Sequence, residues 1–288
     1  MKILIAGATG QLGNLVVRHL LQKVPGHQLI AIVRNLEKAS ALAELGIKVR
    51  QADYNDPQSL HDAFTPGAKL LFISSSEMDD AIRIVQHDNV VKAAQDRNIR
   101  HIAYTSFAFA EDNPFARVHL ATEHAIRTTP IPYTFLRNGG YVEFFVNTPS
   151  LQTYIKDGTI ITNAHKGKVN AVSRNDLALA AATVLTEDGH ENKTYTLVSS
   201  TPWSFDELAA TLSEVSGTNV IHKSVSMEDL KRQLVQAGMP ERAAETAAYI
   251  YHTIAEGHME KTTDDLACLI GRHTSLKELV ASALQARE

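Results

Sequence analysis

Three glycines spaced three residues apart, Gly7, Gly10 and Gly13, follow the short apolar run at residues 2–6. Glycines let the backbone turn tightly and approach a pyrophosphate closely, and the N–H groups at the start of a helix favour an anion. The hydroxyl of Thr9 can donate to a phosphate oxygen. The spacing differs from the common G-x-G-x-x-G fingerprint. Because the loop separates a predicted strand from a predicted helix, we interpret it as the phosphate loop of a dinucleotide site.

The residue at the end of the second predicted strand selects the nucleotide. A fold that binds NAD usually places an acid there, which holds the ribose hydroxyls. Here the strand ends "AIVRN", so Arg34 takes that place, and Lys38 follows one helical turn later. A guanidinium pairs well with a 2′-phosphate. This predicts NADPH as the cofactor, with NADH as a weaker substitute, and the alternative is that Arg34 is an ordinary solvated arginine.

Two further groups of polar residues end predicted strands at the same edge of the sheet. Asp53 ends the third strand, near where an adenine would rest, although it suits a turn equally well. Ser74, Ser75 and Ser76 end the fourth strand, at the carboxyl edge where ligands bind in open α/β folds. Small hydroxyl residues there leave room for a ribose and a nicotinamide, or simply form a turn.

Residues that could donate a proton do not form the expected pair. Short-chain dehydrogenases with this kind of loop use Tyr-x-x-x-Lys, and none of the eight tyrosines here has a lysine four residues later. The helix that should carry the pair reads "RVHLATEHAIR", in which His119 and Glu123 share one face. His119 is a candidate acid or polar lining, and the alternative is a partly exposed histidine beside a helical glutamate. No cluster has metal-ligand spacing, so we predict no metal.

Alternating strands and helices must position these residues. The first half gives six strand-like and five helix-like segments, and such alternation predicts a doubly wound, Rossmann-type parallel sheet in an α/β fold. The predicted strands are 2–6, 28–34, 48–53, 69–74, 101–106 and 133–137, and the predicted helices are 12–24, 36–46, 57–64, 85–97 and 117–128. We therefore assign residues 1–138 to an NADP(H)-binding domain.

The second half has a different character. Short strands are predicted at 158–162, 168–172, 193–198 and 219–225, an Ala-rich helix at 173–187, and mostly helix after residue 204. We assign residues 139–288 to a smaller, helix-rich substrate-binding lobe from which some segments return to the sheet. The apolar helical segment 240–254 suits either a pocket lid or the face of a homodimer.

Composition limits the class of protein. The chain is 44% hydrophobic, and 32 acidic residues against 28 basic ones give no reason to expect nucleic acid or an anionic membrane as a partner. The single cysteine, Cys268, excludes an intrachain disulfide and fits a reducing compartment. The N-terminal apolar run is shorter than the roughly 7–15 residues of an export signal. No stretch approaches the ~20 apolar residues of a membrane span. We expect a cytoplasmic protein.

Several segments together resemble the NmrA-like family of atypical short-chain dehydrogenases and reductases. They are "GATGQLG", "AIVRN", "ADYND", "LLFISSSE", "HIAYTS", "IPYTFLRNGGY" and "GHENKTYTLV". The resemblance implies that Gln11 and Leu12 join the phosphate loop and that Arg174 reaches the cofactor from the second lobe. It also implies a nicotinamide and substrate side lined by Asn138, Gly139, Gly140, Tyr141, Val142 and Glu143.

The same resemblance implies a reductase that works without the tyrosine–lysine pair. A quinone or a cationic triarylmethane carbon accepts hydride and needs no strong acid, so a planar aromatic acceptor is expected, held against the cofactor by proximity. Phe107, Tyr141, Phe144 and Phe145 are candidate pocket walls, of which we expect at least two to be core, and Tyr141 is also a candidate catalytic residue. The alternative is a regulatory protein that binds the dinucleotide and senses redox state without turnover.

Overall fold

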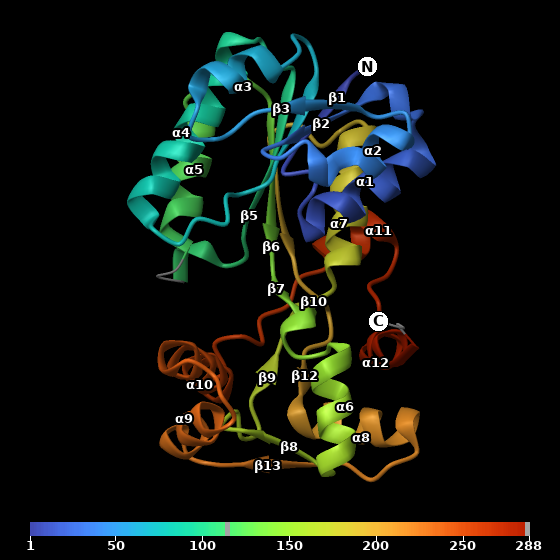
Figure 1. Ribbon diagram of the computed structural model, residues 1–288, viewed down its shortest axis with the longest axis vertical. Coiled ribbons are helices and arrows are strands. Elements are labelled where there is room, and N and C mark those ends of the chain that lie inside the picture. Colours follow the sequence, from blue (N-terminus) through green and yellow to red (C-terminus); the bar gives the residue numbers. More distant parts are fainter. Residues whose placement is uncertain (113–115, 286–288) are drawn as a thin grey trace. The chain divides into compact units, whose positions relative to one another are not determined.

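A computed structural model describes residues 1–112 and 116–285 (Figure 1). Its main feature is a seven-stranded sheet in the order β11-β6-β5-β4-β1-β2-β3, in which every neighbouring pair is parallel. The strands are β1 (Ile3–Ala6), β2 (Leu29–Val33), β3 (Lys48–Gln51), β4 (Lys69–Phe72), β5 (His101–Phe107), β6 (Tyr133–Asn138) and β11 (Lys193–Leu197). The predicted Rossmann-type α/β fold is confirmed.

Helices cover both faces of this sheet, as a parallel sheet requires. On one face lie α3 (Pro57–Ala63), α4 (Asp80–Asp96) and α5 (Arg117–Arg127), and on the other α1 (Gln11–Lys23), α2 (Ser40–Glu44), α7 (Arg174–Thr186) and α11 (Asp265–Ile270) (Figure 1). α7 contacts α1, α11 and three strands. This explains its alanines, because a helix that is buried on most sides needs small side chains to approach its neighbours.

The strand order reverses at β1, whose neighbours β2 and β4 lead the chain toward opposite edges of the sheet. Open α/β folds bind their ligands outside the carboxyl ends of the strands at such a reversal. The predicted phosphate loop follows β1 and the predicted serine loop follows β4. The topology therefore brings these two sequence segments to one place.

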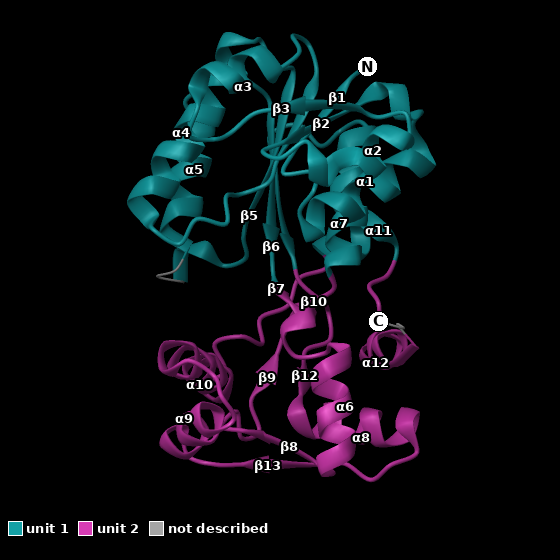
Figure 2. Cartoon of the chain, viewed as in Figure 1, with its two compact units in different colours: residues 1–139, 174–197, 265–271 teal, residues 140–173, 198–264, 272–288 magenta. Residues whose placement is uncertain are grey.

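The chain forms two compact units, drawn in teal and magenta in Figure 2. The first unit comprises residues 1–139, 174–197 and 265–271, and the second comprises 140–173, 198–264 and 272–288. The chain thus returns to the first unit twice after residue 139, once to add α7 and β11 and once to add α11. One expectation is wrong: Arg174 begins α7 and belongs to the first unit, not to the second lobe.

The second unit is built from short strand pairs and helices. Its strands are β7 (Gly140–Tyr141), β8 (Thr159–Thr162), β9 (Lys168–Val169), β10 (Ala171–Val172), β12 (Trp203–Ser204) and β13 (Ile221–Ser224). Its helices are α6 (Thr148–Asp157), α8 (Phe205–Ser216), α9 (Met227–Gln236), α10 (Glu241–Ala255) and α12 (Leu276–Gln285). The predicted strand 168–172 is split at Asn170, whose side chain bonds the backbone of Ser199 in both directions, at 2.6 and 2.7 Å.

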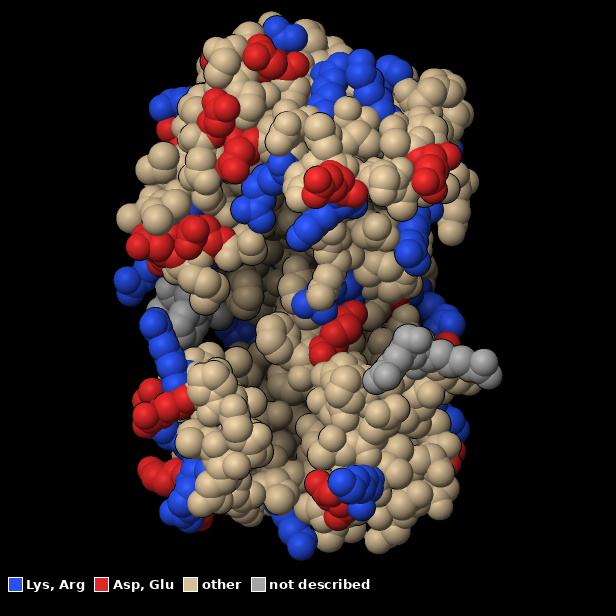
Figure 3. All heavy atoms as spheres, viewed as in Figure 1, with Lys and Arg blue, Asp and Glu red and all other residues tan. Residues whose placement is uncertain are grey.

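Figure 3 shows acidic and basic side chains interspersed over the drawn face of each unit, with no broad field of one sign. Within the described ranges, no helix is both long and apolar enough to cross a membrane. Nor do the described His, Cys, Asp and Glu residues gather into a group that could hold a metal ion.

Candidate active site

The glycine loop presents bare backbone to the carboxyl edge of the sheet. Gly7 has a φ of +86°, and its N–H donates to the Ile32 carbonyl at 3.1 Å. The N–H of Gly10 donates to the Gly7 carbonyl at 3.0 Å. A Cβ on Gly13 would lie 2.2 Å from that same Gly7 oxygen, so only glycine lets α1 pack directly on the loop. The third glycine therefore sets how close the helix start lies to the turn.

The start of α1 is open to an anion. Its N-cap, Gly10, has no side chain that could bond the first-turn amides, and the first turn holds no acidic residue. The first N–H groups of a helix have no partner within the helix and carry the positive end of its dipole. Thr9 and Gln11 are exposed beside this turn, and Leu12 is buried and anchors it. The site therefore suits a pyrophosphate.

Arg34 directly follows β2 and is exposed, and Lys38 is exposed in the short 3-10 helix Glu37–Ala39. The carbonyl of Arg34 accepts a hydrogen bond from Gln51 Nε2 at 3.0 Å, which fixes the backbone that carries the guanidinium. Asp53 makes a turn, because its Oδ1 accepts from the backbone N–H and the side-chain amide of Asn55 at 2.8 and 3.1 Å. One carboxylate oxygen of Asp53 is therefore bonded within the turn, as the turn interpretation predicts.

The serine loop is held by side chains of α4. Arg83 Nη2 donates to Ser74 Oγ at 2.5 Å, and Ser75 Oγ donates to Gln86 Oε1 at 2.5 Å. These two hydroxyls therefore anchor the loop, and the role of the loop in leaving room for a ribose and a nicotinamide stays a prediction. Ser76 is exposed.

His119 is buried at 8% exposure and engaged at both nitrogens. Its Nε2 accepts from Arg83 Nη2 at 2.9 Å, so Nδ1 carries the proton and donates to Tyr104 Oη at 3.0 Å. Burial, and then the nearby Arg83 charge, lower the pKa of His119 to about 3. The imidazole is therefore neutral near pH 7, and its one N–H is already bonded. This argues against the candidate role of His119 as an acid.

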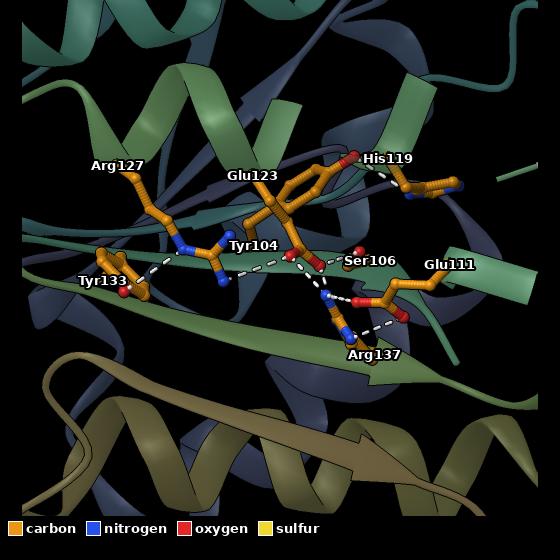
Figure 4. Close-up of polar contacts among 8 residues, drawn as sticks. All are labelled: Tyr104, Ser106, Glu111, His119, Glu123, Arg127, Tyr133 and Arg137. Atoms are coloured by element: carbon orange, nitrogen blue, oxygen red, sulfur yellow. Dashed lines mark hydrogen bonds and ion pairs between the residues drawn. The ribbon is translucent and has the colours of Figure 1, made fainter. Parts of the chain in front are cut away.

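The expected neighbour of His119 has other partners. Glu123 is fully buried, and its Oε1 accepts from Ser106 Oγ at 2.6 Å and from Arg137 Nε at 2.8 Å (Figure 4). Its Oε2 accepts from Arg137 Nη2 at 2.8 Å and lies 3.5 Å from Arg127 Nη2. The sequence expectation of a partly exposed histidine beside Glu123 is wrong, because the tertiary fold brings an arginine and a serine to this carboxylate.

Arg137 completes this charge cluster. It lies opposite Ser106 in the register of β5 and β6, and it also pairs with Glu111 at 2.8 Å. The bonds to Glu123, and then those to Glu111, raise the pKa of Arg137 despite its partial burial. Glu123 thereby ties α5 to two strands at their carboxyl ends. A charged residue inside a strand of a covered parallel sheet needs a partner, and this signal at Arg137 could have revealed the cluster.

The segment 138–143 passes from one unit into the other. Asn138 ends β6, buried, and its carbonyl accepts from Ala108 N–H at 2.9 Å. Gly139 N–H donates to the Leu197 carbonyl at 2.9 Å. Asn138 and Gly139 lie in the first unit. Gly140, Tyr141, Val142 and Glu143 lie in the second, where Tyr141 pairs with Val172 and Val142 is core.

The four candidate pocket aromatics have different surroundings. Phe145 is 7% exposed and packs its ring against Trp203 and Phe205, so its assignment to the pocket wall is wrong and it is core. Phe144 beside it is 70% exposed. Phe107 and Tyr141 are half-buried, and Phe107 lies 6.0 Å from the His119 ring, centroid to centroid.

Comparison with known proteins gives a consistent result. The model of the family described as "NmrA-like family" matches residues 1–278. Quinone oxidoreductase 2 of Escherichia coli strain K12 is 40% identical over 275 residues, which cover 95% of each chain. The match extends along nearly the whole of both proteins, so the resemblance inferred from short segments is confirmed.

Two solved structures are similar over both units. Triphenylmethane reductase of Citrobacter sp. complexed with NADP(H) is 60% identical, with a TM-score of 0.94 over 98% of this chain and 100% of that one. The NADPH-dependent quinone oxidoreductase of E. coli complexed with NADPH is 40% identical, with a TM-score of 0.89 over 97% and 99% of the two chains.

Proposed function

Because the chain belongs to the NmrA-like family, we propose that it is an NADPH-dependent reductase that delivers hydride to a planar electrophilic acceptor, a quinone or a cationic triphenylmethane-type dye. The observation that carries the proposal is the open glycine loop at the strand reversal, followed at the end of β2 by Arg34 in place of an acid. Relatives named for quinone and triphenylmethane reduction support it.

The residues of the first unit fit NADPH. Gly7, Thr9, Gly10, Gln11 and Leu12 would hold the pyrophosphate, because a Cβ at the packed glycine position of α1 would strike the loop and the helix start is uncapped. Arg34 would meet the 2′-phosphate, with Lys38 adding charge. When bound, the cofactor supplies the hydride. The protein's own part is to hold it in place and to exclude water.

The two candidate proton donors on α5 are both engaged, and this bears on the kind of acceptor. His119 is neutral with its N–H bonded, and Glu123 is locked to Arg137 and Ser106. A simple ketone would become an alkoxide and need a proton at the moment of transfer. A quinone gives a weakly basic phenolate that water can protonate, and a triarylmethane cation gives a neutral product. The arrangement therefore suits acceptors of the last two kinds.

The missing tyrosine–lysine pair also fits a second function, a dinucleotide-binding redox sensor without turnover. The two differ in one respect, which is consumption of NADPH. We would follow NADPH absorbance anaerobically with a naphthoquinone, malachite green, an aromatic aldehyde or no acceptor, with NADH in parallel. The reductase consumes NADPH with the quinone or the dye and not with the aldehyde. Tight NADPH binding with no turnover on any acceptor would instead favour the sensor.

A further inference from the structure

His87 lies beneath the loop that follows β4. It comes from α4, is 1% exposed, and packs edge-on against Phe72 with ring centroids 5.0 Å apart. Its Nε2 is 3.0 Å from the backbone nitrogen of Ser75, and its Nδ1 is 2.7 Å from Thr122 Oγ1 on α5. One imidazole thus joins a loop amide to the neighbouring helix.

The donors along this chain of bonds have only one arrangement. A backbone N–H can only donate, so Nε2 of His87 is the acceptor and Nδ1 carries the proton. Thr122 Oγ1 gives its own proton to the Val118 carbonyl at 2.7 Å and can therefore accept from Nδ1. The relay Ser75 → His87 → Thr122 → Val118 is saturated, and it fixes the neutral Nδ1–H tautomer.

Hydrogen bonds to side chains, rather than backbone hydrogen bonds to a neighbouring strand, hold this loop in place. β4 ends at Phe72, and two amides of the loop that follows bond side chains: Ser74 N–H donates to Thr105 Oγ1 at 3.0 Å and Ser75 N–H to His87 Nε2. Tyr54 Oη donates to the Ile73 carbonyl at 2.9 Å. The path of residues 73–75 is therefore set by groups from β5, α4 and the segment after β3. His87 is bonded at both of its ring nitrogens and is 1% exposed.

The geometry points to His87 as a positioning residue for the nicotinamide half of the cofactor. This inference rests on the proposed function. The pyrophosphate loop follows β1, and the loop that His87 supports follows β4, the adjacent strand at the reversal. A dinucleotide that crosses this edge with its adenylate half over β2 extends its other half over β4. By holding the Ser75 amide, His87 fixes the wall on which that half rests.

The test uses matched variants and two ligands. His87→Leu removes the acceptor at similar size. His87→Gln can place an amide oxygen near the position of Nε2, and His87→Asn is too short to do so. His101→Leu is the control. His101 is also buried in this unit, at 2% exposure, but it begins β5 and so lies at the amino ends of the strands, away from the loop after β4. Binding of NADPH and of 2′,5′-ADP, which lacks the nicotinamide half, is measured by fluorescence and calorimetry.

We expect His87→Leu and His87→Asn to raise the Kd for NADPH about tenfold, or ~1.4 kcal/mol, and to leave the Kd for 2′,5′-ADP unchanged. His87→Gln should stay within about threefold of wild type, by the usual net value of one hydrogen bond. His101→Leu should lose stability without a change in either Kd. In long-range ¹H–¹⁵N NMR of the apo protein, His87 should show an unprotonated Nε2, and Ser75 an amide protected from exchange.

Three outcomes would overturn the inference. One is a folded His87→Leu protein that binds NADPH as tightly as wild type, and the second is an equal loss of 2′,5′-ADP binding, which would show a general distortion. The third is an NMR signature with the proton on Nε2. If wild type itself fails to bind NADPH, the proposed function falls and this inference falls with it. If wild type binds and turns over while the variants are unaffected, only the inference falls.

Discussion

Glu123 of α5 and Arg137 of β6 form a doubly bonded ion pair, with Nε–Oε1 and Nη2–Oε2 distances of 2.8 Å each, around a carboxylate that solvent does not reach. Burying a charge is costly unless it is paired and hydrogen-bonded. Here Arg137 and Arg127 balance the charges of Glu123 and Glu111, and the Ser106 hydroxyl donates a hydrogen bond to Glu123 (Figure 4). The pair fixes α5 against the carboxyl ends of β5 and β6.

The first prediction concerns this pair. Arg137→Met should lower the free energy of unfolding by about 3 kcal/mol, because it leaves a buried carboxylate without its main partner. The double variant Glu123→Gln/Arg137→Met should recover part of that loss, since no bare charge then remains. Urea unfolding of the two single variants and the double variant gives the coupling energy. Strictly additive losses would contradict the interpretation.

Arg34 should determine the cofactor preference. Arg34→Ala removes a charge-assisted contact of about 1.5–3 kcal/mol, so KM for NADPH should rise by about tenfold or more while KM for NADH changes little. Lys38→Ala should have a smaller effect in the same direction. Steady-state kinetics with both nucleotides measures the ratio. Equal effects on NADPH and NADH would mean that the guanidinium does not read the 2′-phosphate.

Gly13→Ala should damage the phosphate loop. The new Cβ would meet the Gly7 carbonyl oxygen at 2.2 Å, so α1 must move away from the loop at a cost of about 1–3 kcal/mol. NADPH should bind more weakly as a consequence. Gly189→Ala is the control, because nothing lies within 4 Å of its added Cβ, although Gly189, unlike Gly13, has a positive φ of +87°. It should lose some stability without weakening NADPH binding, and an equal loss of binding would refute the account of the loop.

Acid should destabilise the first unit well above the range in which carboxylates titrate. Burial lowers the pKa of His87 and His119 to about 3 and that of His101 to about 4. These folded-state values lie below the unfolded value of about 6.5, so as pH falls below about 6.5 only the unfolded chain takes up the protons. Each histidine then removes up to ~1.4 kcal/mol of stability per pH unit.

Urea unfolding between about pH 7 and pH 5 measures this slope. His101→Leu, which removes one of the three groups, should make the slope shallower, even though its stability at neutral pH is lower. A stability that stays flat across this range would show that the three imidazoles are protonated as readily in the folded protein as in the unfolded chain.

Alanine substitution of two adjacent phenylalanines should change the stability of the protein by very different amounts. Phe145→Ala removes a core ring packed against Trp203 and Phe205, so stability should fall by about 3–5 kcal/mol. Phe144→Ala removes a ring that is 70% exposed, so stability should change by less than about 0.5 kcal/mol. If Phe144 contacts the acceptor, KM for a quinone should rise while the Kd for NADPH stays constant. An unchanged quinone KM would remove Phe144 from the acceptor site.

Local patterns were sufficient to predict the central sheet and the glycine loop. Apolar runs that end in glycine or in polar residues mark buried parallel strands, and Gly13 packs against the loop directly before it in the sequence. The short strand 193–198 was also visible in the sequence. Its place at the edge of the main sheet, beside β6, depends on the path of the whole chain.

The side-chain partners in the site could not be predicted in this way. Helical spacing predicts that Glu123 lies beside His119, because both are on one helix. In the fold, Glu123 instead pairs with Arg137 of β6, fourteen residues later in the sequence. The sequence places the Ser74 and Ser75 hydroxyls where a ligand could bind, but in the structure both are hydrogen-bonded to side chains of α4. The way the helices pack on the sheet determines which donor bonds which acceptor. The spacing of residues along one helix does not predict that packing.

The most direct test of hydride transfer without an acid is isotopic. NADPH carrying deuterium at both C4 positions is mixed with malachite green under single-turnover conditions, and the colourless product is analysed by mass spectrometry. The account predicts one deuterium on the central carbon and a rate constant that is independent of pH near neutrality. A product without deuterium, or a rate that follows the titration of a protein acid, would contradict it.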